Sequence, residues 1–179
     1  PRGARARHEP RGALDRAALE HRLDACLAAG TNGIALLGLI TEVKALTLAE
    51  RETLVRWTVD RVAGRVPVMA TIAGETLDEV HALAAAAEQA GADSLVLQPP
   101  IGQRPSSTDL LEFYSSAMAG IGTEVGSQNA PEFLGVGLSP EEVLRLRERH
   151  AHFTVMKGEG PVVHVKPFVD ALGSTMRVF

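Results

Sequence analysis

Short apolar runs alternate with amphipathic stretches along this chain. Four runs are apolar at consecutive positions and partly β-branched, at residues 33–37, 66–70, 94–97 and 152–156. Runs that are apolar on both faces are typical of strands in a parallel sheet covered by helices. Two weaker strands are predicted at residues 123–127 and 176–179, and strand starts recur about every 30 residues, the length of one βα unit.

The stretches between the runs carry the start and stop signals of helices. Thr47 and Thr76 each stand three residues before a glutamate, which is the pattern of a capping box. Ser139 has the same spacing and is followed by a proline, which favours the first helical position. Three glycines stand where such helices would close in the left-handed conformation: Gly30, Gly64 and Gly91. These signals predict a βα repeat.

A sequence repeat supports the same organisation. Residues 29–34 resemble residues 90–95, and both would lead from a helix end into a buried strand. Right-handed crossovers then give a parallel sheet with helices outside it. A complete eight-stranded βα barrel takes about 250 residues, whereas 179 residues with six visible strands also fit an open doubly wound sheet. Composition alone slightly favours the open sheet.

Composition and charge exclude several classes of protein. The chain is 45% hydrophobic and 22% charged, which is typical of a folded α/β domain. Its formal net charge of −4 argues against nucleic acid or an anionic membrane as a partner. No apolar run approaches the roughly 20 residues of a membrane span. We interpret residues 1–11, which hold four arginines and no apolar run, as a frayed leader before one domain at residues 12–179.

Cys26 is the single cysteine, so no internal disulfide can form, and this fits a cytoplasmic location. It shares a helical stripe with Leu19 and Leu23, which predicts a buried core thiol rather than a nucleophile. The histidines lack the spacing of metal ligands, and no phosphate-binding fingerprint is present. The sequence therefore predicts no metal site and no cofactor.

Lys157 is the candidate nucleophile. It ends the apolar run at residues 152–156 and precedes a turn at the carboxyl edge of the sheet, where parallel α/β folds place their sites. Loss of hydration would lower the pKa of its amine and make the neutral amine reactive toward carbonyl carbons. From position alone, an ordinary lysine that extends into solvent is the alternative.

Two loops at the same predicted edge could contact a substrate. Gly38, Leu39 and Ile40 follow the first run, and such a turn can offer backbone N–H groups to a carboxylate. Gln128 and Asn129 follow a later strand and supply amide donors and acceptors. Taken alone, each segment is typical of an ordinary loop.

Taken together, these segments resemble the dihydrodipicolinate synthase and N-acetylneuraminate lyase family. The likeness runs from residue 12 to the end and includes the Gly-x-x-x-Glu turn that starts at Gly38, the Leu-Thr-x-x-Glu-Arg helix start at 46–51, Asn129-x-Pro131 and the strand-end Lys157. The resemblance implies a (β/α)8 TIM barrel, incomplete in this chain, in place of the open sheet. It also implies a homo-oligomer, either dimer or tetramer, and catalysis without a cofactor.

In that family, the lysine at this position forms an imine with pyruvate or a related 2-oxo acid. The resemblance therefore implies that Lys157 is catalytic. It also implies that the turn at Gly38, Leu39 and Ile40 binds the substrate carboxylate, with Asn129 as a further substrate-binding residue.

Several departures change the chemistry that the resemblance implies. Gln128 replaces the tyrosine that transfers protons in the family, and a neutral amide cannot exchange a proton near pH 7. Leu39 and Ile40 replace two threonines, and Phe133 stands where the synthases keep an arginine for a second carboxylate. Glu159, or a water held by Gln128 and Asn129, could take over the proton transfer.

The predicted function is therefore a Schiff-base lyase or aldolase that makes or breaks a carbon–carbon bond of a 2-oxo acid. A dehydratase or decarboxylase that uses the same imine is chemically adjacent. The alternative from another class is a catalytically impaired barrel that binds a small acid or acts only in assembly.

Overall fold

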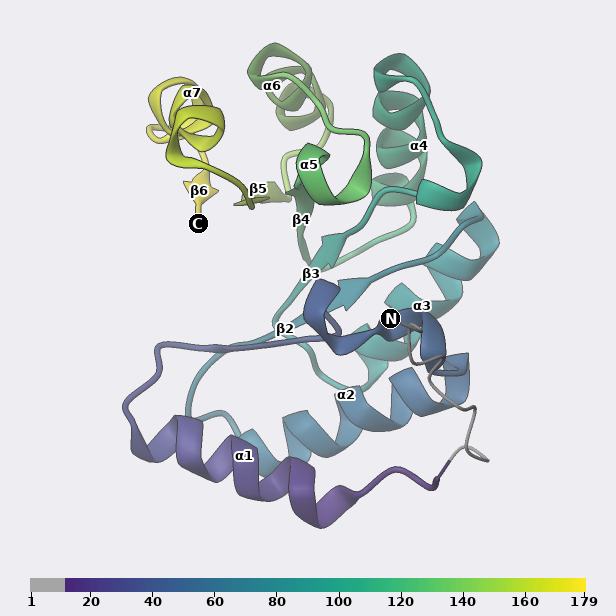
Figure 1. Ribbon diagram of the computed structural model, residues 1–179, viewed down its shortest axis with the longest axis vertical. Helices are drawn as coiled ribbons and strands as arrows, with labels where there is room; N and C mark the ends of the chain where they lie inside the picture. The colour runs from purple at the N-terminus through teal and green to yellow at the C-terminus, as the bar shows by residue number, and fades with distance from the viewer. Residues whose placement is uncertain (1–11) are drawn as a thin grey trace, which may run out of the picture.

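The computed structural model describes residues 12–179, so the predicted leader at residues 1–11 lies outside the described part. Its centre is one six-stranded parallel sheet in which strand order follows chain order (Figure 1). The strands are β1 (Ile34–Leu36), β2 (Val68–Ile72), β3 (Ser94–Leu97), β4 (Glu124–Asn129), β5 (Phe153–Gly158) and β6 (Arg177–Val178). All six predicted strands are present.

The helices form an arc outside the curved sheet, from α1 at one end to α7 at the other (Figure 1). Within residues 12–179 they are α1 (Arg16–Ala28), α2 (Leu48–Val62), α3 (Leu77–Gln89), α4 (Ser107–Ala119), α5 (Pro131–Leu134), α6 (Pro140–Arg149) and α7 (Val162–Leu172). Three short 3₁₀ turns lie in the loops: η1 (Leu39–Thr41), η2 (Val43–Ala45) and η3 (Ile101–Gln103). None of the helices described is long and apolar enough to cross a bilayer.

The predicted helix starts at Thr47 and Ser139 are confirmed as complete capping boxes. At Thr76 only one half of the box forms. Its hydroxyl accepts from the Glu79 N–H, whereas the Glu79 carboxylate accepts from the Glu75 N–H instead. The three predicted stop glycines have positive φ: Gly30 (76°), Gly64 (70°) and Gly91 (88°).

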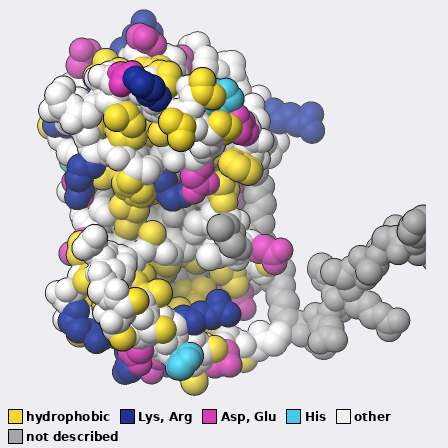
Figure 2. All heavy atoms as spheres, turned by 60° about the vertical axis from the view of Figure 1, so that its left-hand side comes forward, with side chains coloured by type: hydrophobic (Ala, Val, Ile, Leu, Met, Phe, Trp, Pro, Cys, Tyr) yellow, Lys and Arg dark blue, Asp and Glu magenta, His cyan; other side chains and the backbone are white. Residues whose placement is uncertain are grey.

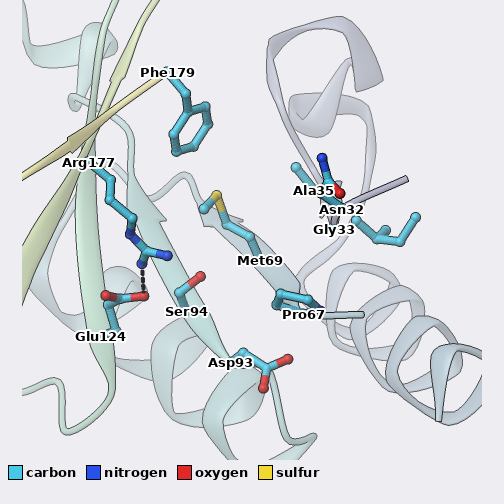
Figure 3. Close-up of a pocket in the computed structure, with 11 residues that line it drawn as sticks. Asn32, Gly33, Ala35, Pro67, Met69, Asp93, Ser94, Glu124, Arg177 and Phe179 are labelled. Carbon is cyan, nitrogen blue, oxygen red and sulfur yellow. Dashed lines mark hydrogen bonds and ion pairs between the residues drawn. The ribbon is translucent and has the colours of Figure 1, made fainter. Parts of the chain in front are cut away.

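The two faces of the sheet have different surroundings. On the outer face, apolar side chains pack with the helices into the main core, and they include Ala70, Ile72, Leu95, Leu97, Val125 and Met156. On the inner face, a hollow of about 360 Å³ is lined by side chains from several strands, among them Met69, Ser94 and Glu124. Figure 2 brings this side forward and shows apolar side chains in the hollow. In Figure 3, Arg177 from β6 reaches across and pairs with Glu124.

The prediction that Cys26 is buried is wrong, because its side chain is exposed. The helix α1 packs on α2 through Leu23, which forms a small core with Val62 and is flanked by Leu19. Cys26 lies at the margin of that apolar stripe, on a part of α1 that is exposed to solvent. The prediction of an apolar stripe on α1 is therefore correct for Leu19 and Leu23, but the stripe does not extend to Cys26.

Candidate functional site

The carboxyl ends of β3, β4 and β5 bring three polar side chains into one row. Lys157 on β5 is the register partner of Gln128 on β4, and Gln98, the residue after β3, bonds to Gln128. Met156 and Leu97, which precede two of these residues, belong to the core on the helix side. Because side chains alternate along a strand, the row of Gln98, Gln128 and Lys157 lies on the inner face. We name these three residues the polar row.

Gln98 and Gln128 form a buried amide pair. Gln98 Nε2 donates to Gln128 Oε1 at 2.8 Å, and the two residues are 6% and 1% exposed. Gln128 Nε2 is buried and has no hydrogen-bond partner among the described residues. A buried donor without a partner costs roughly 1–3 kcal/mol. This N–H group therefore suits contact with an oxygen atom of a bound molecule.

The amine of Lys157 is largely enclosed. Its side chain is 17% exposed, and Nζ forms an ion pair with the carboxylate of Glu159, whose side chain is 32% exposed. Burial lowers the pKa of the Lys157 amine from its ordinary value of 10.5. Lys157 and Glu159 are two residues apart at the end of a strand, so their side chains leave the same face. A proton acceptor therefore touches the candidate nucleophile.

A pocket of about 520 Å³ opens beside the polar row and meets it at Gln98. Its lining also includes Leu39 and Glu42, from the loop after β1, and Phe133 and Leu134 from α5. These residues follow the carboxyl ends of three strands, which is the edge that the sequence predicted for the site. Phe133 is 68% exposed.

The turn after β1 lies at the carboxyl edge of the sheet. Gly38 has extended backbone and precedes η1, and Leu39 lines the 520 Å³ pocket. The side chain of Ile40 lies outside what the structure describes. Glu42 ends the turn with a left-handed backbone, at φ 47° and ψ 44°, a conformation that is sterically unfavourable for a residue with a Cβ. Both ends of this turn, Leu39 and Glu42, line the pocket.

Asn129 does not join the polar row. Its Nδ2 donates to the carbonyl of Leu138 at 3.1 Å, and its Oδ1 accepts from the Leu138 N–H at 2.9 Å. Since β4 continues to Asn129, the side chains of Gln128 and Asn129 point to opposite faces. Asn129 therefore ties the loop after β4 to the start of α6.

The chain's one tyrosine, Tyr114, lies on α4 and is buried, with 1% of it exposed. Its hydroxyl donates to the backbone carbonyls of Leu97 and Gln128, at 3.3 and 3.4 Å. Burial raises the pKa of this phenol. Tyr114 packs against the strands on the helix side of the sheet and is not available for proton transfer at Lys157.

Gln98 is the site residue that the sequence analysis missed. It follows a fully buried strand and precedes two prolines. A polar residue at the carboxyl end of a buried parallel strand is a signal of a site residue, and this signal was present. The sequence did not show that β3 pairs with β4 in the register that places Gln98 beside Gln128.

The chain resembles proteins of one family over almost its whole length. The model of the dihydrodipicolinate synthetase family matches residues 5–179. The 4-hydroxy-tetrahydrodipicolinate synthase of Methanococcus aeolicus is 27% identical over 161 residues, which make up 89% of this chain and 56% of that protein. The chain thus spans little more than half the length of this curated relative.

Solved structures show the same fold. YagE, a prophage protein from E. coli of the dihydrodipicolinic acid synthase family, has a crystal structure in complex with pyruvate. It superposes with a TM-score of 0.88 at 26% identity, over 96% of this chain and 59% of YagE. The 4-hydroxy-tetrahydrodipicolinate synthase from Methylacidiphilum fumariolicum gives a TM-score of 0.87 at 29% identity, over 93% of this chain and 56% of that one. The predicted TIM barrel, incomplete in this chain, is confirmed.

Proposed function

Because the chain belongs to the dihydrodipicolinate synthetase family, we propose that Lys157 forms an imine with pyruvate or a related 2-oxo acid. The neutral amine attacks the C2 ketone, and the resulting carbinolamine loses water to give an iminium. The iminium withdraws electrons while the bond between C3 and C4 forms or breaks. The reaction class is that of a lyase or aldolase.

The observation that carries the proposal is the environment of one amine. Lys157 lies on the inner face of the sheet, in register with Gln128, and burial lowers the pKa of its amine. A larger fraction of neutral amine at a given pH is what attack on a ketone requires. This environment supports a nucleophile better than a solvated surface lysine.

Glu159 is proposed as the group that exchanges protons with the amine and the carbinolamine. Its carboxylate already contacts Nζ of Lys157, so transfer of a proton needs no rearrangement of the chain. Gln128 is proposed to donate a hydrogen bond to a substrate oxygen, because its Nε2 is buried without a partner among the described residues. Glu159 thereby supplies the proton chemistry that an amide at position 128 lacks.

The turn at Gly38, Leu39 and Ile40 is proposed to bind the substrate carboxylate through backbone N–H groups. Its place supports this role, because Leu39 lines the pocket that meets the polar row at Gln98. A dimer or tetramer and a cytoplasmic location belong to the same proposal and rest on family membership alone.

A barrel that binds a small acid without turnover is the second candidate. The observation that favours it is the loss of the phenol, since Tyr114 is sealed behind the sheet and an amide stands at position 128. A dehydratase or decarboxylase that uses the same imine is compatible with the first candidate. Product analysis would separate these reactions once the imine is established.

Borohydride trapping tests the proposal. The protein is incubated with pyruvate and with a panel of other 2-oxo acids, reduced with borohydride, digested and analysed by mass spectrometry. We expect a covalent mass increase on the peptide that contains Lys157, and no increase there in a Lys157→Arg variant. Calorimetric binding of a 2-oxo acid with no trapped adduct from any member of the panel would support the second candidate instead.

A further inference from the structure

We propose that the 520 Å³ pocket binds an apolar group at the far end of the substrate, and that the Gln98–Gln128 pair binds an oxygen between that group and the imine carbon. This inference rests on the proposed function and specifies its substrate class. The class is a 2-oxo acid with a 4-hydroxyl group and an aryl or branched alkyl substituent at C4. Cleavage of such a compound gives pyruvate and an apolar aldehyde.

The first argument is the polarity of the pocket. Five of the seven described residues that line it are apolar, among them Leu39, Val43 and Phe133, and Glu42 is the one charged side chain among the seven. A second carboxylate on the substrate would meet the Glu42 carboxylate, and no cation among the described lining residues offsets the repulsion. An apolar group would instead cover Phe133, which is 68% exposed, and gain from burial of its surface.

The second argument is the unused donor in the polar row. Gln98 holds the Oε1 of Gln128 at 2.8 Å and thereby sets the orientation of the amide. The Nε2 of Gln128 is left buried and without a partner among the described residues. Because this group can only donate, its ligand must be an acceptor such as a hydroxyl or carbonyl oxygen.

The third argument is the continuity between the two features. Gln98 both lines the pocket and bonds to Gln128, which is the register partner of Lys157. Phe133 lies on α5, which begins two residues after the end of β4, the strand that carries Gln128. Imine carbon, oxygen and apolar substituent are therefore expected in this order from Lys157 toward the pocket.

The step is a retro-aldol cleavage of the iminium. The 4-hydroxyl proton passes to the Glu159 carboxylate, the C4–oxygen bond becomes a carbonyl, and the C3–C4 electron pair moves into the enamine. The enamine then takes a proton at C3, and water hydrolyses the iminium to pyruvate and free lysine. The Gln128 N–H stabilises the negative charge that develops on the C4 oxygen.

Aldehyde preference in the condensation direction tests the inference. The full protein is supplied with pyruvate and either benzaldehyde, isobutyraldehyde or the anionic succinic semialdehyde, and products are quantified by liquid chromatography and mass spectrometry. We expect kcat/KM at least tenfold higher for the two apolar aldehydes. In Phe133→Arg we expect this ratio to fall tenfold or more, because the guanidinium would attract the carboxylate and reduce the apolar surface.

Val169→Arg is the matched control, since Val169 is also an exposed apolar residue, at 47%, and lies on α7 outside the pocket. It should keep the aldehyde preference of the unchanged protein. If pyruvate is trapped on Lys157 but both kinds of aldehyde react equally, the pocket inference is overturned and the proposed function stands. If pyruvate is never trapped on Lys157, the proposed function fails and the inference fails with it.

Discussion

Gln128 and Lys157 are register partners across β4 and β5, and their side chains share the inner face of the sheet. One is an amide whose Nε2 has no hydrogen-bond partner within the described part of the chain, and the other is an amine whose pKa is lowered by burial. Neither can replace the other, because the amide cannot take up a proton and the amine is the proposed nucleophile. The proposed division of tasks between them, with Glu159 as the proposed proton acceptor, leads to the following predictions.

Replacing Glu159 by glutamine should slow formation of the Lys157 adduct by roughly 10²-fold, the lower range for loss of a positioned acid or base. The variant keeps the size of the side chain but removes the proton acceptor that contacts Nζ. The measurement is the rate of borohydride-trapped pyruvate adduct. Glu141→Gln, on the exposed first turn of α6, is the matched control. An unchanged rate in Glu159→Gln would exclude the carboxylate from proton transfer.

Replacing Gln128 by methionine should lower turnover roughly 10²-fold, as removal of one donor to a developing oxyanion does elsewhere. Methionine has a similar volume, so the core around this 1% exposed position should stay packed. Steady-state rates with pyruvate and benzaldehyde are the readout. Gln89→Met, at an exposed position on α3, makes the same chemical change away from the site. Equal rates in both variants would contradict a role for the Gln128 donor.

The rate of adduct formation should rise with pH and reach half of its maximum below pH 10.5. Burial lowers the pKa of the Lys157 amine from that value, and the unprotonated amine is the reacting form. The fraction of reactive amine therefore increases as pH rises through the lowered pKa. Trapping rates across a pH series give the midpoint, with Nα-acetyl-lysine as the solvated reference. A midpoint at or above that of the reference would contradict the effect of burial.

Gly126→Ala should lower the free energy of unfolding by about 1–3 kcal/mol, the usual cost of overpacking. A Cβ at this position would lie 2.8 Å from both the Cβ and the carbonyl oxygen of Val155. The register of β4 and β5 shifts between Val125 and Gly126, so the same change should also weaken adduct formation at Lys157. Urea unfolding measures the stability. Gly12→Ala, where a Cβ meets nothing within 4 Å, should be close to neutral.

Asn129→Ala should destabilise the protein by about 1–3 kcal/mol, because it leaves the buried N–H and carbonyl of Leu138 without their partner. Urea unfolding and the pyruvate concentration that half-saturates trapping are measured together. Asn32→Ala, at an exposed loop position, is the control. If the half-saturating pyruvate concentration rose tenfold while the free energy of unfolding stayed unchanged, Asn129 would instead contact the substrate.

Much of the fold could be predicted because its signals are local. The apolar runs, the caps at Thr47 and Ser139 and the positive-φ glycines each depend on a few neighbouring residues. Lys157 and Glu159 could also be paired from the sequence, since alternate residues of a strand share a face. Patterns over a few neighbouring residues were sufficient to predict these features.

The rest of the site depends on where a strand ends and what lies beside it. Had β4 stopped at the predicted residue 127, Gln128 and Asn129 would both be loop residues free to face a substrate. Instead, β4 continues through Gln128 and Asn129, so their side chains point to opposite faces of the sheet. Asn129 accepts a hydrogen bond from the Leu138 N–H. Gln98 enters the site only through the alignment of β3 with β4. Such alignments are set by packing between distant segments and leave no local pattern in the chain.

The order of the strands in the sheet is also their order in the chain. Each strand after β1 therefore pairs with one that was synthesised about one βα unit earlier, and each pairing closes a short loop at a small entropic cost. Gln98, Gln128 and Lys157 come from three such consecutive units. The proposed nucleophile and the two amides of the polar row can thus come together as the nascent chain emerges from the ribosome, before any later segment is needed.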